Sequence, residues 1–105
     1  MATNYQRGRA FEYRTRDKLL KDGAVYVMRA AQSKGKVDLI ACWPLHPKYS
    51  DQVWLIQCKR DGKLPKVERD ALLQIEFNTG LPAYLAKTGA NGRGVVFQRL
   101  YKEAQ

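Results

Sequence analysis

The sequence has few acidic side chains: ten aspartates and glutamates stand against 19 lysines and arginines, which leaves a formal net charge of +9 over 105 residues. This excess exceeds what solubility requires and favours a polyanionic partner. The basic residues are scattered, and no separate helix combines a basic face with a bulky aromatic face, as a membrane-surface helix would. We therefore expect the partner to be nucleic acid. A protein that is merely basic is the alternative.

Long apolar runs are also missing. Stretches such as LIACW are far shorter than the ~20 residues of a membrane span, so we expect no membrane association. The start, MATNYQRGRAFEYR, lacks the apolar stretch of a secretion signal. With 45% apolar residues and no low-complexity tract, residues 1–105 are expected to form a single domain.

Cysteine and histidine are scarce. Cys42 and Cys58 form no CxxC pair and are expected to be reduced core residues of a cytoplasmic protein. A zinc site from these two and His46 would lack a fourth ligand and the usual spacing. His46 lies between two prolines and is expected in a surface loop.

The remaining pattern predicts an α/β domain. Helices are expected at 4–22, with Asn4 as a possible N-cap and Gly23 after its end, and at 65–79, with Gly80 after its end. Strands are expected at 24–31, 37–43, 52–60, 82–87 and 94–100. The order αβββαββ indicates a mixed sheet flanked by helices. The third strand is expected at its centre because apolar residues occur on both of its faces.

A glycine-rich segment, TGANGRGV, separates the last two strands. It does not fit GxxxxGK[ST] and does not lead from a strand into a helix. We therefore expect a hairpin turn and no nucleotide cofactor.

Polar residues interrupt the apolar strands at the third strand's end and at the second strand's start. In VWLIQCKRDGK, Gln57 and Lys59 share one face of the strand, with Cα atoms roughly 6.5 to 7 Å apart. Asp38 interrupts VDLIACW in the same way. Burying a carboxylate, an amide and an ammonium is costly unless they serve each other or a ligand. A divalent cation suits them.

The first helix adds a second carboxylate. Glu12 falls on one helical stripe with Thr15 and Leu19, so it is expected to face the sheet. The alternative is a partly exposed glutamate paired with Arg9 or Arg16.

Together, GRAFE, VMRAAQSKGKVDLIA and IQCKR resemble the small archaeal-type Holliday junction resolvases, also found in phages, within the PD-(D/E)xK nuclease superfamily. The resemblance implies a restriction-endonuclease-like fold with a mixed sheet of about five strands. It also implies metal-dependent hydrolysis of paired phosphodiesters in four-way DNA junctions, in the cytoplasm of a cell or of a phage host.

Position by position, the resemblance makes Glu12 the helix-borne acidic residue, Asp38 the central metal ligand and Lys59 the catalytic lysine. Gln57 stands where most members have glutamate. Ser33 matches a serine of the loop before the aspartate strand.

The implied ligands of Mg²⁺, with Mn²⁺ as the alternative metal, are Asp38, the Gln57 side-chain oxygen and the backbone carbonyl of Cys58, with Glu12 reached directly or through water. The metal would activate a water that attacks phosphorus, and Lys59 would orient that water or stabilise the transition state. Because an amide replaces a carboxylate at Gln57, we expect weaker metal binding. The rival interpretation is a decayed site that only binds DNA.

By the resemblance, Arg29 matches a basic residue just upstream of the family's serine, and Ser33 and Arg29 are both expected near the scissile phosphate or the DNA backbone. Basic residues around the site are expected to contact DNA phosphates by charge and shape. These residues are Arg7, Arg9, Arg14, Arg16, Arg29, Lys34, Lys36, Arg60, Lys63 and Lys66.

A two-fold symmetric junction calls for two active sites, so a homodimer is expected. On the second helix, Val67, Ala71 and Ile75 are predicted to face the sheet, which would leave Leu73 and Phe77 for the dimer interface. Ordinary core packing of Leu73 and Phe77 is the alternative. Two other functions remain open: a flap-cutting nuclease of the same superfamily and a non-catalytic DNA-architectural protein.

Overall fold

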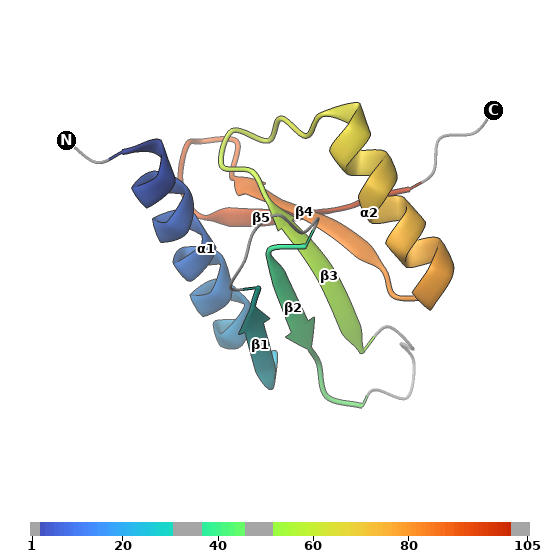
Figure 1. Cartoon of the computed structure of the whole chain (residues 1–105). Helices are drawn as coiled ribbons and strands as arrows, with labels where there is room; N and C mark the ends of the chain where they lie inside the picture. The colour runs from blue at the N-terminus through green and yellow to red at the C-terminus, as the bar shows by residue number, and fades with distance from the viewer. Residues whose placement is uncertain (1–2, 31–36, 46–51, 102–105) are drawn as a thin grey trace.

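The computed structural model describes residues 3–30, 37–45 and 52–101. Its elements follow the predicted order αβββαββ (Figure 1): α1 (Asn4–Lys21), β1 (Tyr26–Arg29), β2 (Leu39–Cys42), β3 (Val53–Cys58), α2 (Lys66–Thr79), β4 (Ala83–Thr88) and β5 (Val95–Arg99). The strands form one sheet in the order β1-β2-β3-β4-β5. Only β3 and β4 run parallel within it. The mixed sheet and the central position of the third strand are thus confirmed.

The helix α1 begins with a capping box. The Thr3 hydroxyl accepts the Gln6 backbone N–H at 3.1 Å, and the Gln6 side chain accepts the Thr3 N–H at 2.8 Å. The prediction that Asn4 is the N-cap is therefore wrong, because Asn4 already belongs to the helix. The chain leaves the helix through Gly23, whose φ of 115° favours glycine.

The two helices cover opposite faces of the sheet. On the α1 side, Phe11 and Leu19 pack with Leu39, Ala41 and Ile56. Thr15 is fully buried beside them, and its hydroxyl donates to the Phe11 carbonyl at 2.8 Å. An apolar stripe on α1 therefore anchors this helix and fixes the direction in which its remaining side chains point.

On the α2 side, Leu72 is fully buried and packs with Leu55 and Leu85. The predicted helix phase is partly wrong. Val67 is 81% exposed rather than turned to the sheet, and Leu73 packs partly against the core. The reason is that Leu72, with more apolar surface than Ala71, takes the central contact.

An ion pair fastens α2 to the sheet. The Arg99 guanidinium donates to both oxygens of Glu76, at 2.7 and 2.8 Å. Glu76 also accepts the Ala83 N–H at 3.0 Å, and the Arg99 guanidinium holds the pKa of Glu76 below its usual value. A two-point contact of this kind restricts the orientation of the helix.

Because side chains alternate along a strand, β3 contributes side chains to the core on both faces of the sheet. Ile56 and Cys58 belong to the α1 side and Leu55 to the α2 side, which places Gln57 and Lys59 on the α2 side.

Membrane-spanning helices are not found in the described part of the chain, because neither α1 nor α2 combines the necessary length with the necessary apolar character.

Candidate active site

Asp38 joins the start of β2 to the end of β3. Its backbone N–H donates to the Ile56 carbonyl at 2.8 Å, and its Oδ2 accepts the Cys58 N–H at 2.8 Å. The residue is only 8% exposed. A side-chain oxygen thus satisfies a backbone donor at the end of β3 and holds the carboxylate there.

Gln57 and Lys59 lie at this end of β3. Gln57 is 7% exposed. The Lys59 ammonium donates to Oε1 of Glu68, in the first turn of α2, at 3.2 Å. Sequence reasoning did not identify Glu68. The available signal was its helical spacing from Leu72 and Ile75, which places it on the sheet-facing stripe.

The second oxygen of Glu68 has an unusual position. Oε2 is shielded from solvent and makes no hydrogen bond within the described ranges, although it also lies 3.2 Å from the Lys59 nitrogen. The Lys59 charge therefore stabilises both oxygens of the Glu68 carboxylate.

A second ion pair approaches from the α1 side. The Arg29 guanidinium, at the end of β1, donates to Glu12 at 3.1 Å, and their side chains are 25% and 17% exposed. The expectation that Glu12 points towards the sheet agrees with this burial. Its partner is neither Arg9 nor Arg16, because β1 brings Arg29 alongside α1.

The electrostatics link these groups. Burial raises the pKa of Asp38, against the Cys58 hydrogen bond and the Lys59 charge, which lower it. Burial also raises the pKa of Glu12, and the nearby Asp38 charge adds to that rise, whereas Arg29 opposes it. Asp38 is therefore coupled to both ion pairs, the one from α1 and β1 and the one from β3 and α2. Raised carboxyl pKa values of this kind are common at functional sites.

Both cysteines are free thiols, as predicted. Burial raises the pKa of the Cys58 thiol, and the nearby Asp38 charge raises it further. A thiol that stays protonated is a poor nucleophile. Cys58 therefore contributes packing and backbone groups here.

The oxygen atoms at the end of β3 can be compared with the ligands that a metal ion requires. Within the described ranges, no three His, Cys, Asp or Glu residues are grouped so as to hold one. The carboxylate of Asp38, the side-chain amide oxygen of Gln57 and the backbone carbonyl of Cys58 are, however, all oxygen donors at one end of β3. Hard oxygen donors suit Mg²⁺ or Mn²⁺. The residues fit such an ion in chemistry, with an amide in place of one carboxylate.

Most of the predicted DNA-contacting residues lie on the surface. Those that are exposed are Arg7, Arg9, Arg14, Arg60, Lys63 and Lys66. Arg16 is paired with Asp17 at 3.1 Å. Ser33, Lys34, Lys36 and His46 lie outside the described residues.

Tyr13 is a further surface feature that sequence reasoning missed. The guanidinium carbons of Arg16, Arg29 and Arg9 lie 5.0, 5.5 and 5.9 Å from its ring centroid. The hydrogen bond and charge of Arg9 hold the pKa of Tyr13 below its usual value. Arg9 and Arg16 stand four residues before and three residues after Tyr13, the spacing of helical neighbours.

Comparison with solved structures identifies a related fold. The Holliday junction resolvase Hjc of the archaeal hyperthermophile Archaeoglobus fulgidus superposes with a TM-score of 0.65, over 94% of this chain and 79% of that one. The chain shares the fold of Hjc. The restriction-endonuclease-like fold expected from the resemblance is thereby confirmed. The sequences are 20% identical, so the likeness establishes the fold alone. No family model and no curated protein matches the sequence.

Proposed function

We propose that this protein is a magnesium-dependent endonuclease that cuts four-way DNA junctions. The observation that carries the proposal is the position of Asp38, a buried carboxylate coupled to Lys59 on one side and to Glu12 on the other. These groups lie in a fold shared with Hjc, a Holliday junction resolvase. The net charge of +9 supports a DNA partner.

In this proposal Asp38, the Gln57 side-chain oxygen and the Cys58 backbone carbonyl hold Mg²⁺ or Mn²⁺, with Glu12 reached directly or through water. The bound metal would supply polarisation of the phosphodiester and a lowered pKa for an attacking water. Asp38 contributes negative charge, and the Cys58 N–H fixes the direction of its carboxylate.

Lys59 has the role of stabilising charge that develops on the phosphate. Its ammonium is held by Glu68, so it is oriented before DNA binds. Arg29 holds Glu12 in place and offers a cation near the phosphate. Ser33, five positions before Asp38 in the sequence, is a proposed contact to the scissile phosphate.

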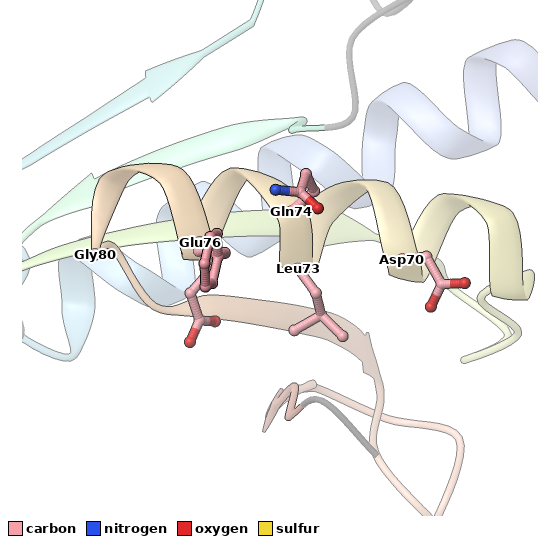
Figure 2. A pocket seen from close by; sticks show the side chains of 6 residues that line it. Asp70, Leu73, Gln74, Glu76 and Gly80 are labelled. Carbon is pink, nitrogen blue, oxygen red and sulfur yellow. The ribbon is translucent and has the colours of Figure 1, made fainter. Parts of the chain in front are cut away.

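The proposal includes a homodimer, since two symmetric cuts need two sites. On α2, Phe77 is 81% exposed. It borders a hollow of about 430 Å³ together with Leu73, Asp70, Gln74, Glu76 and Gly80 (Figure 2). A second copy would bury this aromatic ring and fill the hollow.

The test is cleavage of a labelled four-way junction in Mg²⁺, beside a flap and a linear duplex. We expect symmetric paired nicks in the junction alone, and their loss in Lys59→Ala. Lys21→Ala, which removes an exposed lysine at the end of α1, is the matched control. Cleavage of the flap in preference to the junction would contradict the junction assignment.

A junction-binding protein without nuclease activity is the second candidate. The amide of Gln57, at a position where a carboxylate would complete the donor set, favours it. Such a protein would bind junctions equally in Mg²⁺ and in EDTA and leave them intact, whatever residue occupies position 59.

A further inference from the structure

A basic hollow lies between α1 and the turn that joins β4 to β5. Its volume is about 460 Å³, and the cations that line it are Arg14, Lys18, Arg60 and Arg93. Among the described residues that line it, none is acidic. Lys18 also pairs with Asp22 at 3.0 Å. Four cations from three parts of the chain therefore surround one concave surface, and Asp22 pairs with one of them.

Hydrogen bonds connect the backbone segments around the hollow. The Thr88 N–H donates to the Arg60 carbonyl at 3.2 Å, which ties the end of β3 to the end of β4. In the turn, the Gly92 N–H donates to the Gly89 carbonyl at 2.9 Å, and Asn91 accepts the Arg93 N–H at 3.0 Å. The arginines at 60 and 93 are thus carried by fixed backbone.

Glycines make this turn possible. A Cβ at Gly89 would lie 2.5 Å from the Arg93 carbonyl oxygen, which is too close for any other residue. Gly92 and Gly94 have φ values of 77° and 69°, a region that favours glycine. The glycine-rich segment is therefore the turn of the β4–β5 hairpin, and it places Arg93 in the same hollow as Arg14 and Lys18 of α1.

The hollow adjoins the candidate active site on the α1 side of the sheet. Arg60 directly follows Lys59, which lies on the α2 side. Val95, which lines the hollow, belongs to the core on the α1 side. The hollow therefore lies at the same end of β3 as Lys59, on the side of the sheet from which Glu12 approaches Asp38. One bound DNA could reach both sites.

We infer that the basic hollow binds a backbone phosphate of DNA, separate from the phosphate that is cut. This inference extends the proposed function by naming a second point of contact. Guanidinium groups are suited to phosphate because they donate paired hydrogen bonds. Such a contact positions a DNA arm without reading its sequence.

The test measures affinity without cleavage. Binding of a fluorescent four-way junction and a linear duplex is followed by anisotropy in EDTA at several salt concentrations. Arg60→Gln and Arg93→Gln should each weaken binding several-fold and lower the slope of log K against log salt by about 1. Arg93→Lys should retain most of the affinity, and Lys21→Gln should change neither quantity.

Arg60→Gln and Arg93→Gln variants that fold with the wild-type melting temperature yet behave like Lys21→Gln would overturn the inference. Wild-type protein that binds no DNA would overturn it as well. Binding that depends on Arg60 and Arg93, together with intact junctions in Mg²⁺, would contradict the nuclease proposal and leave the hollow's assignment standing.

Discussion

Lys59 at the end of β3 and Glu68 in the first turn of α2 form an ion pair, with 3.2 Å between the lysine nitrogen and the nearest carboxylate oxygens. The candidate catalytic lysine is thus held by a helix that packs on the sheet through Leu72. Glu68 is a positioning residue in this arrangement, because it acts through Lys59.

Glu68→Gln should lower the single-turnover cleavage rate about 10-fold, the scale typical of groups that orient a functional residue. Junction affinity in EDTA should stay equal or rise, because a negative charge near the DNA is lost. Asp17→Asn removes an equal charge from an exposed position on α1 and should leave the rate unchanged. Equal losses of rate and affinity would argue against a positioning role.

Gln57→Glu should keep or raise cleavage at low Mg²⁺, because a second negative charge strengthens binding of a hard cation. The measurement is cleavage rate against Mg²⁺ concentration, with metal binding followed by calorimetry in the absence of DNA. A Gln57→Glu variant that is well folded but inactive would contradict the proposed metal ligands.

Asp38→Asn should abolish cleavage and yet raise the melting temperature at pH 7.5, by about 4 °C if the gain is ~1 kcal/mol. The pKa of Asp38 is raised by burial, so its charged form lowers stability at pH values above that pKa. The asparagine oxygen can still accept the Cys58 N–H.

The stability difference between Asp38→Asn and wild type should shrink as the pH falls towards the ordinary aspartate pKa of about 3.9, where the wild-type carboxyl becomes neutral. Thermal melts between pH 4 and 8 provide the measurement. A pH-independent difference would show that the Asp38 charge is not its cause.

Arg29→Gln should destabilise the fold by on the order of 1 kcal/mol at pH 7.5, because Glu12 would lose its partner. Arg29 opposes the rise in the Glu12 pKa, so without it that pKa rises further. The loss should therefore diminish below the Glu12 pKa, as protonation removes the unpaired charge. Melts at pH 4 and 7.5 provide the comparison, with Arg29→Lys as the variant that keeps the charge.

Phe77→Ser should shift a dimer to monomer in analytical ultracentrifugation while the monomer stays folded, because the ring is 81% exposed. Val67→Ser is the matched control, since Val67 is equally exposed in the first turn of the same helix. Loss of association in both variants would mean that the hollow beside Leu73 is not the interface.

The site residues on or directly beside strands were the ones that the sequence allowed us to identify. A polar group within an apolar run is conspicuous, and this pattern singled out Asp38, Gln57 and Lys59. Their burial or their coupling in the structure agrees with that interpretation. The phase of α2 was less predictable, because Ala71 and Leu72 are both apolar and only packing decides which one faces the sheet.

The sequence by itself determined the element order, the mixed sheet and the basic character, since these follow from local periodicity, glycine positions and composition. Tertiary structure decided which charged side chains form ion pairs with one another. Arg29 reaches Glu12 across 17 positions of the chain, and Glu68 reaches Lys59 across nine. Many cations could pair with a given carboxylate, and only the packing of β1 against α1 and of α2 against β3 selects among them.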